Sequence, residues 1–240
     1  MSPAGVTEIA ERHARLLERL SRAAAAAGRD ASPCRIVAIT KGFGIEVARD
    51  AAAAGLSRLG ENRVQEALAK VVALPAVEWH LVGHLQSNKV RRAVEAFDWI
   101  HSVDSLELLA RVDRAAVDAG RSPTVLLQVN ITDEASKSGF AAAWLAREAA
   151  PGGNLTTALA GLRHARVVGL MAIGRDGADD RQARDTFREL RALRDRLEQS
   201  LGRPLPELSM GMSADCEQAV AEGATLVRIG RALFGQRPAA

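Results

Sequence analysis

Lys41 is the residue of this sequence best placed for covalent chemistry. It directly follows a short apolar and β-branched run, residues 35–40 (RIVAIT). Partial burial at the end of a strand lowers the pKa of an ammonium group, and the neutral amine that results can form a Schiff base with a carbonyl compound. The alternative is a surface lysine that ends a strand, and position alone gives the two readings equal weight.

A second candidate site is Ser209–Ser213 (SMGMS), where two hydroxyl groups flank a glycine immediately before an expected helix. Glycine lets the backbone approach a ligand closely, and the free amides at a helix N-terminus bind phosphate. Gly230 stands at a similar strand-to-helix turn, after Val-Arg-Ile. Together the two loops favour a phosphate site over the alternative, a capping serine and a turn glycine.

Arg228 is the third candidate, because it lies within an expected strand. The two-residue period of a strand places it on the same face as Leu226 and Gly230. A buried guanidinium needs an acceptor or an anion. Arg228 therefore binds either a ligand or a barrel carboxylate such as Glu61, and the sequence leaves both readings open.

Other motifs do not support a site. Residues 230–235 have the glycine spacing of a P-loop, but Gln236 and Arg237 replace the required Lys-Ser/Thr pair. His80 and His84 would lie about 13 Å apart on a strand, so they could share a metal only after a sharp turn. No cysteine or carboxylate cluster completes a zinc site, and we expect no metal.

Alternating strand-like and helix-like segments must position these candidates. The segments expected to form strands are 35–40, 58–60, 78–82, 99–103, 124–130, 167–173, 207–210 and 226–229. The segments expected to form helices are 5–27, 46–54, 63–72, 87–95, 105–119, 141–150, 180–201 and 213–222, with 151–160 as a loop.

This alternation predicts an α/β fold with parallel strands and right-handed crossovers. Eight units favour a closed (β/α)8 TIM barrel over the alternative, an open doubly wound sheet. We expect one domain over residues 1–240, with an extra N-terminal helix in 1–30 and the barrel in 35–237. Functional residues of such barrels lie at the C-terminal ends of the strands, where all three candidates stand.

Composition narrows the partners and the compartment. The net charge is only +3 with the basic residues dispersed, aromatic residues make up 3%, and tyrosine is absent, which argues against nucleic-acid binding. No apolar run reaches the roughly 20 residues of a membrane helix, and no signal-peptide core is present. Cys34 and Cys216 form no disulfide framework, so we expect a cytoplasmic protein.

The sequence resembles the pyridoxal phosphate homeostasis protein family, which is similar to the alanine racemase barrel. The matching stretches are VAIT-Lys41, LGENRVQEAL (59–68), WHLVGHLQSNK (79–89), IHSVDS (100–105), VNITDEASKSGF (129–140), GLMAIG (169–174), LSMGMSAD (208–215) and VRIGRALFG (227–235). They run in order through almost the whole chain after the N-terminal helix, so the resemblance is specific. In one departure, Phe43 replaces the second lysine of the Lys-Thr-Lys-Pro motif that many members carry.

The resemblance implies an alanine racemase N-terminal-domain-like barrel that carries pyridoxal 5′-phosphate as a Schiff base on Lys41. It also implies that the loops around Ser213 and Gly230 hold the phosphate, that Arg228 faces the pyridine nitrogen, and that Asn62 lies close by. The implied cofactor-binding residues are Lys41, Asn62, Met171, Ser209, Met212, Ser213, Arg228, Ile229 and Gly230.

Two functions remain: a protein that binds and supplies pyridoxal phosphate without catalytic turnover, and a racemase-like enzyme. Racemisation needs two bases on opposite faces of a carbon, and barrel racemases pair the lysine with a tyrosine that this chain lacks. His84, Cys216 or Lys137 could substitute in principle, but no motif suggests it. We therefore favour the carrier, a monomer with apo-enzymes as transient partners. Lys137 is either a second docking lysine or, as we favour, a loop lysine.

Overall fold

The computed structural model describes residues 5–29, 34–134, 137–175 and 177–236. The expected limits of the N-terminal segment (1–30) and of the barrel (35–237) extend into residues 1–4, 30 and 237, which lie outside the described residues. None of the described helices is long and apolar enough to cross a membrane.

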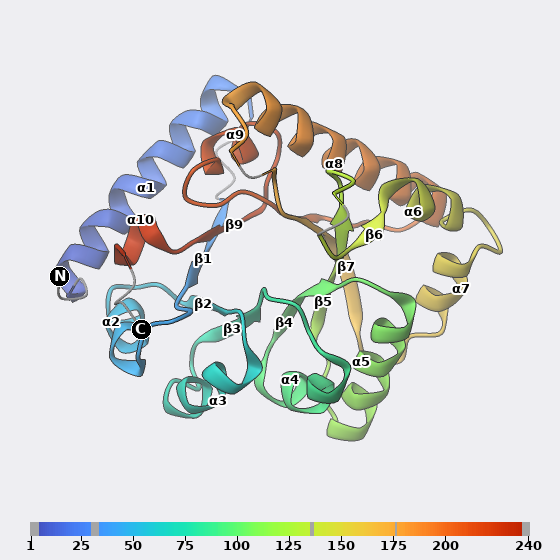
Figure 1. The fold of residues 1–240 in the computed structure, drawn as a ribbon, viewed down its shortest axis with the longest axis horizontal. Coiled ribbons are helices and arrows are strands. Elements are labelled where there is room, and N and C mark those ends of the chain that lie inside the picture. The colour runs from blue at the N-terminus through green and yellow to red at the C-terminus, as the bar shows by residue number, and fades with distance from the viewer. Residues whose placement is uncertain (1–4, 30–33, 135–136, 176, 237–240) are drawn as a thin grey trace.

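Eight parallel strands form a closed barrel, and helices surround it (Figure 1). The barrel strands are β1 (Arg35–Ile39), β2 (Arg58–Glu61), β3 (Glu78–Leu81), β4 (Trp99–Val103), β5 (Thr124–Asn130), β7 (Arg166–Ala172), β8 (Glu207–Ser209) and β9 (Leu226–Ile229). Strand β1 pairs with β2 on one side and β9 on the other, and pairing of β4 with β5 closes the ring. The predicted TIM barrel is confirmed, with each strand end within one residue of expectation.

The helices lie outside the barrel and complete the βα units (Figure 1). They are α1 (Val6–Ala26), α2 (Ile45–Ala53), α3 (Val64–Ala73), η1 (Ser87–Lys89), α4 (Val90–Ala96), α5 (Leu106–Ala119), α6 (Ala142–Glu148), α7 (Asn154–Ala160), α8 (Asp180–Leu201), α9 (Cys216–Ala221) and α10 (Arg231–Phe234). The extra helix α1 packs against α2, α9 and α10. It buries Ile9, Leu16, Leu20 and Ala24, which recur at helical spacing.

The expected loop 151–160 is wrong, because helix α7 occupies most of it. Leu155 and Leu159, one helical turn apart, are buried beneath that helix. The preceding Pro-Gly-Gly, which is typical of a loop, conceals this short apolar stripe. A two-residue strand, β6 (Phe140–Ala141), was also not expected; it pairs with the end of β5.

The barrel strands bury both faces. Val37 and Ile39 pack inside the barrel with Leu126, Met171 and other apolar side chains, whereas a larger apolar layer lies between the strands and the helices. The two-residue period that points Val37 and Ile39 inward directs the next position of the series, residue 41, toward the barrel axis. The fold therefore presents Lys41 at the C-terminal mouth of the barrel.

Candidate functional site

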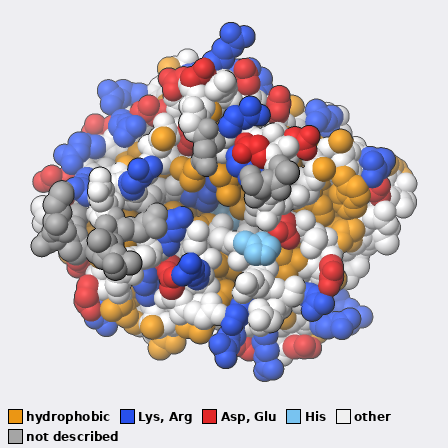
Figure 2. All heavy atoms as spheres, viewed as in Figure 1, with side chains coloured by type: hydrophobic (Ala, Val, Ile, Leu, Met, Phe, Trp, Pro, Cys, Tyr) orange, Lys and Arg blue, Asp and Glu red, His pale blue; other side chains and the backbone are white. Residues whose placement is uncertain are grey.

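A cavity of about 460 Å³ opens at the C-terminal ends of the barrel strands. Figure 2 shows a hollow at the centre of the molecule in the orientation of Figure 1, with Lys and Arg side chains around it. Six of the nine residues singled out from the sequence line this cavity: Lys41, Asn62, Met212, Ser213, Arg228 and Gly230. They come from the exits of β1, β2, β8 and β9, which barrel closure brings together.

The other three residues lie deeper and do not line the cavity. Met171 is fully buried in the apolar interior of the barrel, and Ile229 is fully buried in the layer between strands and helices. Ser209 is fully buried too, and its hydroxyl oxygen accepts a hydrogen bond from Arg228 at 2.8 Å. Any contact that they make with a ligand is therefore through backbone groups or through a neighbouring side chain.

The strand exit that carries Lys41 is anchored from outside the barrel. The Thr40 hydroxyl donates to Glu61 Oε1 at 2.6 Å, and Lys70 Nζ donates both to Glu61 Oε1 at 2.6 Å and to the Thr40 carbonyl at 3.0 Å. We call Thr40, Glu61 and Lys70 the outer triad; all three side chains are buried. Because Lys70 holds the carbonyl next to Lys41 in the chain, the outer triad fixes where Lys41 leaves the strand.

The outer triad also corrects one reading of Arg228. An ion pair between Arg228 and Glu61 is wrong, because Glu61 pairs with Lys70 on the outer side of the barrel. Glu61 follows Gly60, whose position faces the interior beside Val37 and Ile39, so its own side chain points outward.

Arg228 is buried in the barrel and held by oxygen atoms from two neighbouring strands. Nη1 donates to the Ser209 carbonyl and hydroxyl, both at 2.8 Å, and Nη2 donates to the Ala172 carbonyl at 2.9 Å. Burial lowers the pKa of Arg228 to about 10, against the opposing charge of Asp215, so the guanidinium remains charged at neutral pH. These bonds use three of its five N–H groups, which leaves two for an acceptor in the cavity.

The loops after β8 and β9 meet at the same cavity. Gly211 has a φ of +88°, and a Cβ there would lie 2.5 Å from the Cβ of Ala219, so this turn requires glycine. The Met212 amide donates to Asp215 Oδ1 at 2.6 Å, and the Ala232 amide donates to the Ser213 hydroxyl at 3.3 Å. Ser213 thus joins the two loops into one polar wall.

Comparison with known proteins places this architecture in a family. Residues 13–238 match the family model of the alanine racemase N-terminal domain. A Pseudomonas aeruginosa protein named pyridoxal phosphate homeostasis protein is 44% identical over 235 residues, which covers 97% of each chain. The Escherichia coli K12 protein of the same name is 35% identical over 97% of this chain and 98% of its own.

The chain belongs to the pyridoxal phosphate homeostasis protein family. A solved member similar to it is PipY of Synechococcus elongatus, known without and with pyridoxal phosphate bound. The two forms have TM-scores of 0.82 and 0.80 at 42% and 41% identity, over 95% of this chain and 100% of PipY. Alanine racemase of Corynebacterium glutamicum, 17% identical with a TM-score of 0.69 over 98% of this chain and 63% of its own, shares the fold.

The side chains considered as a second base, those of Lys137, His84 and Cys216, do not line the cavity. Lys137 Nζ donates to Glu134 Oε1 at 2.8 Å, to the Gly174 carbonyl at 3.0 Å and to a threonine hydroxyl at 3.3 Å, so it ties its loop to the end of β7. His84 pairs with Asp104 at 3.2 Å. Cys216 is buried, and burial raises the pKa of its thiol to about 11.

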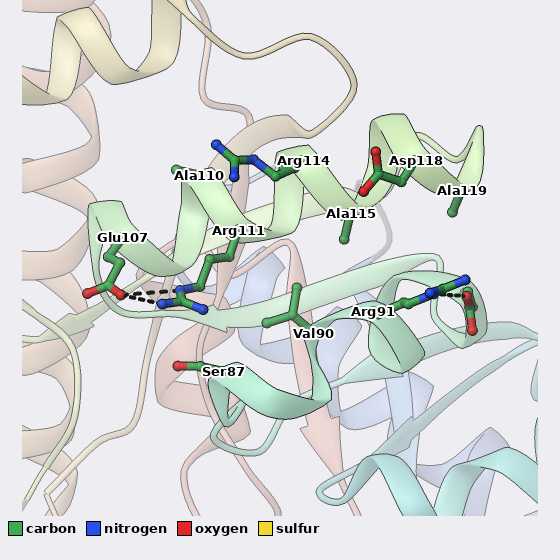
Figure 3. A pocket seen from close by; sticks show the side chains of 11 residues that line it. Ser87, Val90, Arg91, Glu107, Ala110, Arg111, Arg114, Ala115, Asp118 and Ala119 are labelled. Atoms are coloured by element: carbon green, nitrogen blue, oxygen red, sulfur yellow. Dashed lines mark hydrogen bonds and ion pairs between the residues drawn. The ribbon is translucent and has the colours of Figure 1, made fainter.

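A groove between α4 and α5 is an alternative site (Figure 3). Two of its arginines pair within their own helices, Arg111 with Glu107 at 2.8 Å and Arg91 with Glu95 at 3.1 Å. Exposed pairs of this kind solvate a helix surface and do not converge on a ligand. Among the described residues, no group of three His, Cys, Asp or Glu side chains could hold a metal ion.

Sequence reasoning missed several residues of the site. Asp215 and Arg175 line the cavity. Lys70 donates from outside the barrel to the carbonyl of Thr40, the residue before Lys41. A signal for Lys70 was present, because it falls three residues after Ala67 and six after Val64 on the buried face of α3. Arg175 follows the Gly-Leu-Met-Ala-Ile-Gly stretch at the exit of β7, where a barrel places functional residues.

Proposed function

We propose that this chain binds pyridoxal 5′-phosphate, as a Schiff base on Lys41, in the cavity at the C-terminal mouth of the barrel, which we call the mouth cavity. In this proposal it takes part in intracellular pyridoxal phosphate homeostasis and supply, without catalytic turnover of its own. The observation that carries the proposal is the convergence of Lys41, Arg228 and the Ser213–Gly230 wall on one cavity. Its relatives carry the name of that function, and PipY has been solved with pyridoxal phosphate bound.

The donor set fits each part of this cofactor. Lys41 supplies a primary amine for the aldehyde, which is the reactive group that pyridoxal phosphate brings to the site. Ser213 and the backbone amides of Ile229 and Gly230 would hold the phosphate, joined by the Met212 amide once it exchanges its hydrogen bond to Asp215 for one to the ligand. Neutral and charged donors suit its oxygens, and Arg231 adds a positive charge on the same wall.

Arg228 would face the ring nitrogen, with Asn62 beside the ring. An arginine stays protonated and can only donate, so it leaves the ring nitrogen without a proton of its own. An unprotonated ring withdraws electrons less strongly, which supports binding over general carbanion chemistry.

The placement of acid–base groups supports a carrier over a racemase-like enzyme. The chain has no tyrosine. Of the possible substitutes, His84 and Lys137 form ion pairs and Cys216 is buried, and none of the three lines the cavity. A racemase needs a second base on the face of the substrate carbon opposite Lys41. We infer a monomeric, cytoplasmic, single-domain protein that hands its cofactor to apo-enzymes through transient contacts.

Cofactor titration identifies the lysine that binds pyridoxal phosphate, and a racemisation assay separates the carrier from the enzyme. Purified wild type, Lys41→Ala and Lys137→Ala are each titrated with pyridoxal phosphate while the visible absorbance is followed. We expect the absorbance band of the Schiff base to appear in wild type and in Lys137→Ala, and to be lost in Lys41→Ala. Chiral chromatography of L-amino acids incubated with the loaded protein should detect no D-isomer. Loss of the band in Lys137→Ala alone would move the anchor to that loop, and steady racemisation would make the chain an enzyme.

A further inference from the structure

A line of buried polar side chains crosses the barrel interior and ends on Arg228. His80 Nδ1 lies 2.9 Å from His101 Nε2, and His101 Nδ1 lies 2.9 Å from Ser209 Oγ, which accepts from Arg228. At the other end, His80 Nε2 lies 3.0 Å from Glu78 Oε1. We call Glu78, His80, His101 and Ser209 the interior chain. Its two histidines and Ser209 are fully buried.

The interior chain connects opposite walls and opposite ends of the barrel. Strand β3, which carries Glu78 and His80, is separated from β8 by three strands on the side of β1. Arg228 lines the cavity at the C-terminal mouth, whereas Glu78 lines a second cavity, of about 640 Å³, at the N-terminal end with Asp98 and Arg121. A continuous series of contacts thus joins the two cavities.

With both rings neutral, the Glu78 carboxylate sets the direction of the hydrogen bonds in the interior chain. The carboxylate can only accept, so His80 donates to it from Nε2–H and His80 Nδ1 carries no proton. His80 Nδ1 therefore accepts from the Nε2–H of His101, and His101 Nδ1, left without a proton, accepts from the Ser209 hydroxyl. The Ser209 oxygen accepts in turn from Arg228, which can only donate.

The charge states agree with that direction. A hydrogen bond from His80 and the charge of Arg58 lower the pKa of Glu78 despite partial burial, so its carboxylate is ionised at neutral pH and can only accept. Burial lowers the pKa of His80 and holds that of His101 well below its usual range, so both rings are neutral. Trp99 stacks on the His80 ring at 5.3 Å between centroids and fixes its plane.

We propose that Glu78, His80, His101 and Ser209 are positioning residues that aim the Arg228 guanidinium at the cavity and link its charge to the Glu78 carboxylate at the far end of the barrel. Without the interior chain, Arg228 would be a buried cation held by two backbone carbonyls. With the interior chain, aligned hydrogen-bond dipoles run from the Arg228 guanidinium to the Glu78 carboxylate. The part of the inference that concerns ligand binding rests on the proposed function; the direction of the chain does not.

The direction is tested first, on wild-type protein without added cofactor. Long-range ¹⁵N–¹H NMR spectra report which ring nitrogen of each histidine carries the proton, and His13→Gln, His84→Gln and His164→Gln assign the other three signals. At neutral pH we expect both interior histidines as neutral Nε2–H tautomers. An Nδ1–H tautomer or a charged ring at either position would overturn the proposal. This experiment stands whether or not the protein binds pyridoxal phosphate.

The link to Arg228 is tested by variants at both ends of the interior chain. Ser209→Ala should weaken the affinity for pyridoxal phosphate about tenfold and shift the visible band, because Arg228 loses an acceptor, and Ser209→Thr should retain both. Glu78→Gln should move the His101 Nδ1 ¹⁵N resonance. Glu207→Gln is the matched control: it removes a carboxylate from the same end of the barrel, paired with Arg35 and Thr225 outside the chain.

A folded Ser209→Ala with wild-type affinity and spectrum would overturn the positioning role. So would equal effects of Glu78→Gln and Glu207→Gln on His101. If Ser209→Ala does not fold, the comparison of Glu78→Gln with Glu207→Gln decides. If wild type itself fails to bind pyridoxal phosphate, the proposed function falls, while the NMR comparison still tests the chain.

Discussion

The outer triad and the interior chain are two buried polar clusters that support residues of the mouth cavity, and their charges are arranged differently. The outer triad contains a direct ion pair between Lys70 and Glu61, with side chains 6% and 0% exposed. In the interior chain, neutral groups that each donate and accept lie between the charge of Glu78 and that of Arg228. In the outer triad, Glu61 Oε2 is buried without a hydrogen-bond partner among the described residues, whereas no buried side-chain nitrogen or oxygen of the interior chain lacks one.

This difference suggests that one cluster mainly stabilises the fold and that the other mainly orients Arg228. A direct buried ion pair depends strongly on both partners, because removal of one leaves an uncompensated charge. A directional chain of neutral groups can transmit orientation, since each hydrogen bond sets the next. We therefore expect the outer triad to control mainly the free energy of unfolding, and the interior chain to control mainly the behaviour of the cavity.

The largest expected effect is the loss of the outer ion pair. Lys70→Met should lower the free energy of unfolding by about 3–5 kcal/mol, because the Glu61 carboxylate then stays buried without its cation. Urea unfolding followed by tryptophan fluorescence measures the change. The double variant Glu61→Leu/Lys70→Met should regain most of the loss, and a single variant as stable as wild type would show that the triad carries no stability.

A second variant acts on the interior side of the same strands. Arg228→Ala should weaken retention of pyridoxal phosphate at least tenfold, since it removes the cation that we propose to face the ring and the donor that orders Ser209. Gel filtration of the loaded protein, followed by absorbance, measures retention. Arg111→Ala, in the distant groove of Figure 3, is the control with an equally large truncation. Equal retention in both would separate Arg228 from the site.

The interior histidines make the stability of the fold depend on pH. Their pKa values are lowered on folding from an ordinary value of 6.5, mainly by burial. Below about pH 6.5 the unfolded state therefore binds protons that the folded state does not, and stability falls as pH falls. The charges that face them are Glu78, Arg58 and Asp98 for His80, and Arg228 and Arg35 for His101.

Urea midpoints at pH 7.5, 6.5 and 5.5 measure that dependence. We expect little change between the first two values and a clear decrease at pH 5.5. Glu78 contributes only at lower pH, because its pKa is lowered to about 2 and its stabilisation is lost as pH falls below about 4.5. A midpoint that rises toward pH 5.5 would mean that the interior histidines are charged in the folded protein.

The smallest effect is expected on the outer surface of the barrel. Arg91→Ala removes a pair with Glu95 in which both side chains are exposed, so the free energy of unfolding should change by less than about 0.5 kcal/mol. The same urea series measures it. A loss comparable to that of Lys70→Met would show that the groove between α4 and α5 does more than solvate two helices.

The sequence predicted the fold well because barrel strands carry local signals. Short apolar runs bounded by glycine or by charged residues located all eight strands, and helix α8 was expected at its observed bounds, Asp180–Leu201. Helix α7 was missed because its signal is a single pair of leucines behind Pro-Gly-Gly. Local pattern therefore decides the elements wherever an apolar stripe is longer than one turn.

The site was predictable only in part, because its supports depend on which strands face each other. The position of Lys41 follows from its strand, and that of Gly230 from its turn. That His101 meets Ser209 across the barrel, 108 positions away, follows from closure and register. Lys70 and Glu61 are only nine positions apart and meet where α3 packs on β2, which follows from the βα unit rather than from closure. Contacts such as that of His101 with Ser209 have no local pattern in a single sequence.

Borohydride reduction of the protein loaded with pyridoxal phosphate, followed by peptide mapping, tests the central claim most directly. Reduction converts a Schiff base into a stable adduct, and the peptide that carries it identifies the lysine. The account predicts one labelled peptide containing Lys41, with Lys137 unlabelled at stoichiometric cofactor. A protein that takes up no pyridoxal phosphate, or whose adduct lies on another lysine, would contradict it.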